Sequence, residues 1–278
     1  MNRIDATFRS LRAAGRAAFI PFLVAGDPNK ETFLDIIAAI EPVADIIELG
    51  IPFTDPVADG PVIQAADARA LAAGVSLSRA IGLLAAVRSM TSKPIVVLTY
   101  ANVVGVGERL ARTMDALQAA GVDGIVIADA CFEESSTFRE VARARGMHLI
   151  NLVAPTTSPE RLCLIIAAAT GFVYLVAVKG VTGARAAVVS DTRDLLARVL
   201  HARSGSIPVP ACVGFGISSP VHAAEIASLG ADGIIVGSAL VQQIQHHLDD
   251  TGAMIEAVEM ACKHMRAAIA KAAGGGDP

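Results

Sequence analysis

Short apolar runs alternate with longer amphipathic stretches along most of this chain. The short runs are bounded by glycine and proline and show no alternation of polar and apolar residues, which is typical of strands buried on both faces. Eight such runs predict strands, at Phe19–Val24, Ile46–Leu49, Ile95–Tyr100, Gly124–Ala128, His148–Val153, Phe172–Val178, Val209–Val213 and Gly233–Val236. The stretches between them predict helices, for example at Lys30–Ile40, Ser78–Ser89, Glu108–Ala120, Glu133–Arg145, Pro159–Ala169, Asp191–Arg203 and Pro220–Leu229.

Capping residues mark several ends of these predicted helices. Ser158-Pro159 and Ser219-Pro220 each place a serine at the N-cap before a proline that suits the first helical position. Four glycines that tolerate the left-handed backbone conformation follow helical stretches, namely Gly121, Gly146, Gly171 and Gly230.

Strands joined by helices in this order imply parallel βα units with right-handed crossovers. Eight such repeats fit a closed (β/α)8 barrel better than an open, doubly wound sheet, and barrels of this kind typically have about 250 residues. We therefore predict an α/β protein with a single barrel domain over residues 1–278. We also expect a helix over about 1–16, an extra amphipathic helix over Thr251–Ala273 and a flexible glycine-rich end over 274–278.

Composition narrows the class of function. The chain has 23 Lys plus Arg against 27 Asp plus Glu, a net charge of −4, which argues against a basic nucleic-acid surface. Its four cysteines are far apart and form no CxxC motif, which favours free thiols in a reducing cytoplasm. The one close histidine pair, His246 and His247, points to different faces of a helix, so we expect no metal site.

Two segments bear on membrane targeting. The first 16 residues lack the apolar core of a secretory signal. Leu162–Val178 is nearly continuous apolar sequence, close to the shortest length that spans a membrane. However, Thr170-Gly171 interrupts it, with helix-forming residues before and aromatic and β-branched residues after. We therefore predict a helix, a glycine stop and a buried strand in a soluble, cytoplasmic protein.

An acidic residue interrupts the second predicted strand. Glu48 is the only charged residue in Ile46–Leu49, and a buried carboxyl that is not paired acquires a raised pKa, which suits general acid–base chemistry. The alternative is a structural glutamate bonded inside the barrel. The loop that follows, Pro52–Pro61, holds Asp55 and Asp59 between prolines that restrict its backbone. Active sites of such barrels lie at the carboxyl ends of the strands, so these acids favour a catalytic site there.

Glycine-rich turns follow the last three predicted strands. They are Lys179–Gly183, Gly214–Ser219 and Gly237-Ser238. In such barrels a phosphate commonly binds after strands seven and eight, at the N-terminus of a short extra helix. No lysine or arginine occurs in the last two turns, so backbone N–H groups would supply the binding.

The same residues carry a resemblance to a known family. The stretch 48–64, ELGIPFTDPVADGPVIQ, resembles the signature of tryptophan synthase α subunits, and Ala25-Gly26-Asp27-Pro28, Gly180-Val181-Thr182-Gly183 and 214–219 continue the resemblance in the expected order. The resemblance implies retro-aldol cleavage of indole-3-glycerol phosphate into indole and glyceraldehyde 3-phosphate, without metal or organic cofactor.

The resemblance also implies residue roles, position by position. Glu48 matches the catalytic glutamate that moves protons at indole C3 and at the glycerol hydroxyl. Asp59 matches the aspartate that accepts a hydrogen bond from the indole N–H, and Tyr174 matches an active-site tyrosine. The residues implied to bind indole are Phe22, Leu98, Tyr100 and Phe215, with Thr182 in a closing loop. Those implied to bind phosphate are Gly183, Gly216, Gly237 and Ser238.

Two segments depart from the family pattern. The family's SRSGVTG after strand six is here 177–183, AVKGVTG, which puts closure of that loop in doubt. The family's DVPVEES after strand four is here 129–135, DACFEES, which lacks the proline. We expect both changes to affect regulation more than the reaction, because the catalytic acids remain.

The resemblance implies a partner, the tryptophan synthase β subunit, in an α2β2 assembly whose pyridoxal phosphate belongs to β alone. Pro52, Asp55, Asn102 and Asp129 would lie at that contact. Two alternatives stay open at this point, a stand-alone indole-3-glycerol-phosphate lyase and a weakly active homologue that serves as an activating subunit of the β enzyme. The long motif argues against a neighbouring phosphate barrel such as phosphoribosylanthranilate isomerase.

Overall fold

The barrel is built from nine parallel strands in one sheet. The computed structural model describes residues 1–176, 185–203, 209–214 and 216–273. The strand order is β5-β4-β3-β2-β1-β9-β8-β7-β6. The strands are β1 (Ala18–Val24), β2 (Ile47–Gly50), β3 (Ile95–Thr99), β4 (Gly124–Ile127), β5 (His148–Leu149), β6 (Asn151–Val153), β7 (Val173–Val176), β8 (Ala211–Gly214) and β9 (Gly233–Val236).

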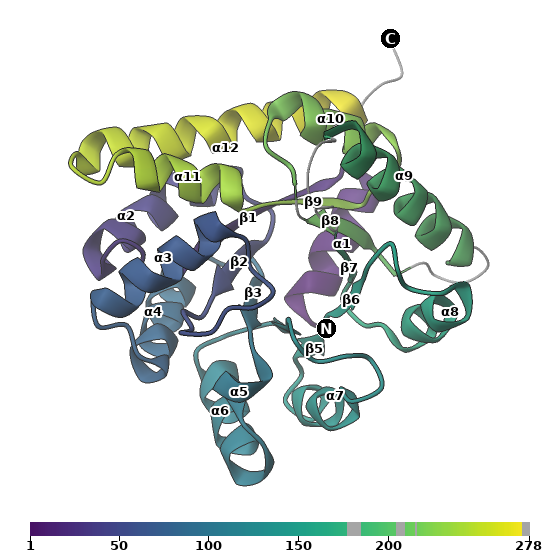
Figure 1. The fold of residues 1–278 in the computed structure, drawn as a ribbon, viewed down its shortest axis with the longest axis horizontal. Coiled ribbons are helices and arrows are strands. Elements are labelled where there is room, and N and C mark those ends of the chain that lie inside the picture. The colour runs from purple at the N-terminus through teal and green to yellow at the C-terminus, as the bar shows by residue number, and fades with distance from the viewer. Residues whose placement is uncertain (177–184, 204–208, 215, 274–278) are drawn as a thin grey trace.

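The two ends of this strand order meet within one predicted strand. β5 pairs with β4, β6 pairs with β7, and only Ile150 separates β5 from β6 along the chain. The sheet therefore closes into a ring with eight strand positions, surrounded by helices (Figure 1). This confirms the predicted (β/α)8, or TIM, barrel.

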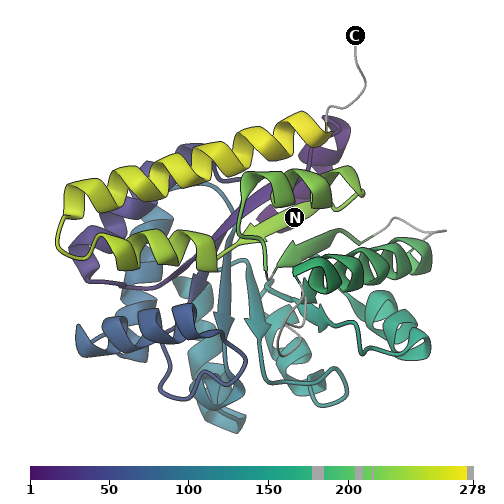
Figure 2. The ribbon, with the colours of Figure 1, turned by 45° about the horizontal axis from the view of Figure 1, so that its top comes forward.

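Helices pack around the ring because each of the eight strand positions is followed by at least one amphipathic segment. They are α1 (Arg3–Ala13), α2 (Lys30–Ile40), η1 (Glu41–Val43), α3 (Pro61–Ala72), α4 (Leu77–Met90), α5 (Ala101–Val104), α6 (Gly107–Ala119), α7 (Ser136–Arg143), α8 (Pro159–Ala168), α9 (Arg185–Ala202), α10 (Pro220–Ser228), α11 (Ser238–His246) and α12 (Thr251–Ala273). The extra helix α12 packs against α10, α11 and α2, across one side of the barrel (Figure 2).

Helix α1 packs against the amino-terminal end of the barrel. Its apolar residues Ile4, Phe8 and Leu11 are buried, and a Cβ atom added at Gly124, the first residue of β4, would lie 2.8 Å from Ile4 Cδ1. The side chain of Asn2 fixes this position by donating to the carbonyl oxygen of Asp123 at 2.8 Å. With the amino end packed in this way, the site must be sought at the carboxyl end.

The strand register shows which side chains face the inside of the barrel. Phe22 of β1 pairs with Glu48 of β2, which pairs with Val96 of β3. On the other side of the ring, Leu152 pairs with Tyr174. Residues at the same register position share a face, and neighbours along a strand point to opposite faces. Glu48 and Tyr174 therefore both face the interior.

Local signals in the sequence account for most helix ends. The side chains of Ser158 and Ser219 accept the N–H groups of Arg161 and His222, which confirms both N-caps. The four glycines expected after helices, Gly121, Gly146, Gly171 and Gly230, all have positive φ.

Some boundaries differ from those predicted. α7 begins at Ser136 instead of at Glu133, because 131–135 forms turns closed by the Ser135 hydroxyl, which donates to the Phe132 carbonyl. α9 begins at Arg185, six residues before the predicted start at Asp191. α3 was not among the predicted helices, since polar residues such as Asp67 interrupt its apolar side. The end at 274–278 lies outside the described residues.

The apolar segment that raised a membrane interpretation is helix α8, a turn at Gly171 and strand β7. No single helix among the described residues is long and apolar enough to cross a membrane. Only α3 and α4 taken together meet that requirement, and they are bent by 101° where they join.

Candidate active site

Glu48 is a fully buried carboxyl without a hydrogen-bond partner. It lies on β2, with an exposed fraction of 0%, and neither carboxyl oxygen has a partner among the described residues. Burial raises its pKa from 4.5 to about 8, and the nearby charge of Asp59 contributes to the increase. A structural glutamate would need partners for its oxygens. The structure thus favours a chemical role for Glu48.

Asp59 reaches the same region from the loop after β2. The Tyr100 hydroxyl donates to Asp59 Oδ2 at 2.6 Å and accepts the Ala58 N–H at 3.2 Å. The Phe53 ring packs on Tyr100, with 5.2 Å between centroids. Burial raises the pKa of Asp59, and the hydrogen bond from Tyr100 opposes the increase. The end of β3 therefore holds the loop that carries Asp59.

Tyr174 faces Glu48 from the opposite side of the barrel. A Cβ atom added at Gly214 would lie 2.5 Å from the Tyr174 ring, so only glycine leaves room for the ring against β8. Burial raises the pKa of the Tyr174 hydroxyl well above its usual value, and the charges of Glu48 and Asp59 raise it further. The three predicted catalytic residues are thus brought together.

The Phe22 ring lies between two glycines at the carboxyl ends of its neighbouring strands. Cβ atoms added at Gly50 and at Gly237 would each lie 2.9 Å from the ring. Leu98 is the register partner of Gly50, so Phe22, Leu98 and the tyrosine after β3 surround one region. Of the residues implied to bind indole, Phe215 and Thr182 lie outside the described residues.

The structure describes the turn Gly237-Ser238 and, apart from residue 215, the turn 214–219. Gly237 is the N-cap of α11, the short extra helix after β9, and Ser238 is its exposed first residue. The N–H groups of Leu240 and Val241 bond to the Gly237 carbonyl, which opens the first turn of α11. Gly216 has a φ of +76°, in the region that favours glycine. Gly183 lies outside the described residues.

The residues predicted for partner contact come from the segments after three adjacent strands, β2, β3 and β4, and Asn102 lies in the short helix α5. Asp55, Asn102 and Asp129 are exposed, whereas Pro52 is buried within the chain. The Asp129 carboxylate accepts the Ala101 N–H at 2.7 Å and so caps α5. These three exposed residues lie at the carboxyl end of the barrel.

Sequence reasoning missed a second group of buried acids near the site. Asp27, in the loop after β1, accepts two hydrogen bonds from Arg69 of α3, at 2.7 and 2.8 Å. Asp67, also on α3, is 5% exposed, and burial together with the charge of Asp59 raises its pKa to about 7. In the sequence, the polar residues within α3 were the one feature that could have indicated these buried acids. No group of three or more potential metal ligands occurs in the described part of the chain.

Comparison with known proteins decides the family. The family model described as tryptophan synthase alpha chain matches residues 8–270. The chain belongs to the tryptophan synthase alpha chain family. The alpha chain of Synechococcus elongatus is 45% identical over 270 residues, 97% of each chain, and that of Gloeobacter violaceus is 46% identical over 245 residues, 87% of this chain and 86% of the other.

Solved structures of tryptophan synthases share the same fold. Subunit alpha from Legionella pneumophila superposes with a TM-score of 0.84 at 33% identity, covering 97% of this chain and 98% of that one. Tryptophan synthase from M. tuberculosis in its aminoacrylate-bound form gives a TM-score of 0.82 at 30% identity, covering 97% and 100%. These comparisons confirm the resemblance that the 48–64 motif indicated, and they extend it over nearly the whole chain.

Proposed function

We propose that Glu48 and Asp59 perform the reaction of this tryptophan synthase alpha chain, with Glu48 as proton carrier and Asp59 as charge stabiliser. The protein is a carbon–carbon lyase of tryptophan biosynthesis that cleaves indole-3-glycerol phosphate. The observation that carries the assignment is the buried carboxyl of Glu48, which lies beside Asp59 and has no hydrogen-bond partner in the described part of the chain. Two neighbouring acids in a buried site share their ionisation, so one carries the proton while the other is charged.

The reaction uses the two acids in different protonation states. With a pKa of about 8, Glu48 is mostly protonated at neutral pH and can give its proton to indole C3. The ring nitrogen then becomes cationic, and the Asp59 carboxylate stabilises that charge. Glu48, now ionised, takes the proton from the adjacent glycerol hydroxyl. The electron pair of the C–C bond moves into the ring, which yields indole and glyceraldehyde 3-phosphate.

Substrate position follows from the residues around the acids. Phe22, Leu98 and Tyr100 offer an apolar and aromatic wall for indole, and Tyr174 closes the side opposite Glu48. The phosphate would lie at Gly216, Gly237 and Ser238, where the first turn of α11 offers backbone N–H groups. From the family pattern, we add Gly183 to the phosphate site, Phe215 to the indole pocket and Thr182 to the closing loop.

The acid–base steps need no metal or organic cofactor, so we propose that the alpha chain works without one and that pyridoxal phosphate belongs to the β subunit. We further propose a cytoplasmic α2β2 assembly. Asp55, Asn102 and Asp129 support the position of the contact, because all three are exposed on segments that follow neighbouring strands at the mouth of the site. Pro52 would support that surface from behind, since it is buried.

The test is cleavage of indole-3-glycerol phosphate by the purified chain with and without β subunit. A rate that rises on adding β supports the α-subunit role, which the family assignment favours over a stand-alone lyase. High activity alone with no response to β would instead indicate the stand-alone enzyme, and no activity even with β the activating subunit. The rate should also fall as the pH rises through about 8, because Glu48 then loses the proton it donates.

Substitution of each acid separates its role. Glu48→Gln should lower the rate at least about 100-fold, since general acid–base catalysis contributes about 10²–10⁴-fold. Asp59→Asn should lower kcat while binding of glycerol 3-phosphate, which represents the phosphate end, stays unchanged. Near-normal turnover of Glu48→Gln would contradict the assignment.

A further inference from the structure

Helix α3 forms hydrogen bonds with both ends of the loop that carries Asp59. At the end of the loop, the Gln64 side-chain amide donates to the backbone carbonyl of Asp59 at 2.9 Å. At its start, the backbone N–H of Phe53 donates to the carboxyl of Asp67. Gln64 and Asp67 are three residues apart, so they are neighbours on the surface of the helix. The position of the loop is therefore tied to that of α3.

The helix itself is fixed against the barrel. Arg69 of α3 donates to both carboxylate oxygens of Asp27, at 2.7 and 2.8 Å, and Asp27 belongs to the loop after β1. The helix also packs against β1 and α11. Its buried side contains Asp67 together with Ile63, Ala66 and Ala70. A group that α3 holds is therefore held in place relative to the strands.

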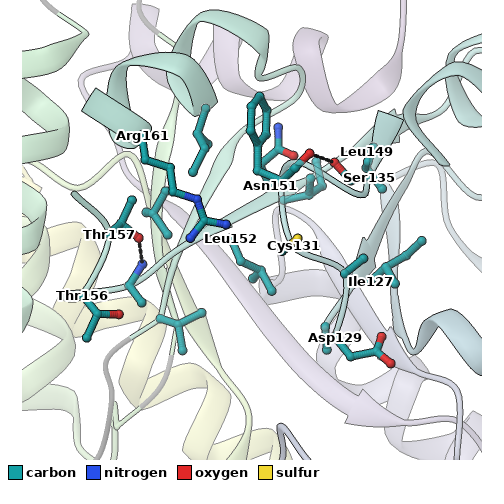
Figure 3. A pocket seen from close by; sticks show the side chains of 18 residues that line it. Ile127, Asp129, Cys131, Ser135, Leu149, Asn151, Leu152, Thr156, Thr157 and Arg161 are labelled. Atoms are coloured by element: carbon teal, nitrogen blue, oxygen red, sulfur yellow. Dashed lines mark hydrogen bonds between the residues drawn. The ribbon is translucent and has the colours of Figure 1, made fainter. Parts of the chain in front are cut away.

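Asp67 is surrounded by protein groups, since its exposed fraction is 5%. A cavity of about 330 Å³ lies at the carboxyl ends of β4 and β6, where Figure 3 shows Asn151 and Arg161 among the residues around it. Asp67 does not line that cavity. The guanidinium of Arg69 binds both oxygens of Asp27, so it balances the charge of Asp27. Asp67 is thus placed to act on neighbouring protein groups and not on a ligand.

Two aromatic rings connect Asp67 with the side chain of Asp59. The Phe53 ring packs on Tyr100 with 5.2 Å between centroids, and the Tyr100 hydroxyl donates to Asp59 Oδ2 at 2.6 Å. Burial and the hydrogen bond to Asp59 raise the pKa of the Tyr100 hydroxyl, and the charge of Asp67 raises it further. The contacts from Asp67 through Phe53 and Tyr100 therefore end at the carboxyl of Asp59.

The two acids differ in the form that their surroundings favour. Burial, followed by the charge of Asp59, raises the pKa of Asp67 to about 7. Burial also raises the pKa of Asp59, but the hydrogen bond from Tyr100 opposes the increase and favours the ionised form. Neighbouring acids share their ionisation, so the proton stays on Asp67 while Asp59 is charged. A neutral carboxyl still accepts an N–H through its carbonyl oxygen.

We propose that Asp67 is a positioning residue for the cleavage reaction, because it accepts the Phe53 N–H and so fixes, through Phe53 and Tyr100, the carboxyl of Asp59. This role rests on the proposed function, in which the Asp59 carboxylate stabilises the cationic indole ring. Asp67 contributes as a hydrogen-bond acceptor, and its own charge is not required.

Two substitutions of Asp67 test the role at about pH 6, where the carboxyl is mostly neutral. Steady-state kinetics are measured on the full chain, with β subunit present where it raises the rate. Asp67→Ala removes the acceptor and should lower kcat about tenfold with less than about a twofold change in KM, because a displaced catalytic group weakens the transition state more than substrate binding. Asp67→Asn keeps an acceptor oxygen and should recover most of the kcat. Wild-type kcat in Asp67→Ala, or equal losses in both variants, would overturn the proposal.

A double substitution tests the route through Tyr100. Adding Asp67→Ala to Tyr100→Phe should lower kcat no more than about twofold further, because both changes release the same carboxyl. A further loss of about tenfold would show independent effects and overturn this route. Asp35→Ala, at an exposed position of α2, is the matched control and should leave kcat unchanged. Urea titration checks the folding of each variant, and Asp67→Leu, which fills the space with an apolar side chain, replaces Asp67→Ala if the latter does not fold.

Asp59→Asn distinguishes this proposal from the proposed function. Normal kcat in Asp59→Asn would overturn both, because Asp59 would then have no role for Asp67 to support. A large loss in Asp59→Asn together with normal kcat in Asp67→Ala would overturn the role of Asp67 alone. In the Asp59→Asn background, Asp67→Ala should have little further effect on kcat.

Discussion

Replacing Glu48 with glutamine should make the chain more stable at high pH relative to the wild type, while removing its activity. The carboxyl has a pKa of about 8 in the folded chain against 4.5 ordinarily, and burial is the main cause. Between these pH values the folded chain keeps a proton that the unfolded chain has lost. Stability of the wild type therefore decreases as pH rises from about 4.5 to 8 because of this group.

The difference between the two pKa values sets the size of the effect. It corresponds to an upper limit of about 5 kcal/mol, since each pH unit is worth about 1.4 kcal/mol. Relaxation of the site reduces this value, so we expect a change of at least about 2 kcal/mol. The glutamine variant cannot ionise, and its free energy of unfolding lacks this pH-dependent loss. The constant cost of burying its amide cancels when two pH values are compared.

The assay is urea unfolding of both proteins at about pH 5 and about pH 8. The advantage of Glu48→Gln over the wild type should grow by about 2–4 kcal/mol between the two conditions, because three pH units at about 1.4 kcal/mol each set the upper limit. Glu31→Gln, on the exposed surface of α2, controls for the loss of one carboxyl from the chain. A difference between wild type and Glu48→Gln that is the same at both pH values would refute the reasoning.

Three further substitutions test the supports of the site. Tyr100→Phe removes the 2.6 Å hydrogen bond to Asp59 and should lower kcat about 10–100-fold with little change in KM, measured by steady-state kinetics. An unchanged kcat would contradict the positioning role. Gly214→Ala places a Cβ atom 2.5 Å from the catalytic tyrosine ring and should abolish most activity, whereas Gly82→Ala, with open space around it in α4, should leave activity intact. Arg69→Ala leaves its buried carboxylate partner unpaired and should lower the free energy of unfolding by about 3–5 kcal/mol in urea titrations. Arg69→Lys should recover part of this stability. Equal stability of Arg69→Ala and the wild type would show that the ion pair contributes nothing.

Local patterns predicted the barrel well because its elements depend on signals that are close together in sequence. The serine caps at Ser158 and Ser219 and the glycine at Gly171 act within one turn of a helix, so the sequence contains all of the information. Helix α3 was not predicted because Asp67, a polar residue, interrupts its apolar side. Asp67 is buried by residues distant in the sequence, which no local pattern shows.

Glu48 was visible in the sequence as one acid in an apolar strand, and the motif around it identified the family. The sequence did not show that its oxygens have no hydrogen-bond partner among the residues that the structure describes, because a partner could have come from any of the facing strands. The contact of Tyr100 with Asp59 joins residues 41 positions apart in the sequence.

The sequence by itself determined the order of strands and helices, their caps and the identity of the candidate catalytic acids. The tertiary structure alone decided that neither carboxyl oxygen of Glu48 has a hydrogen-bond partner among the described residues and that Asp59 is held by Tyr100. The physical reason is that burial and hydrogen bonding of a side chain are set by atoms distant in the sequence, whereas strand periodicity and helix caps are set by neighbours.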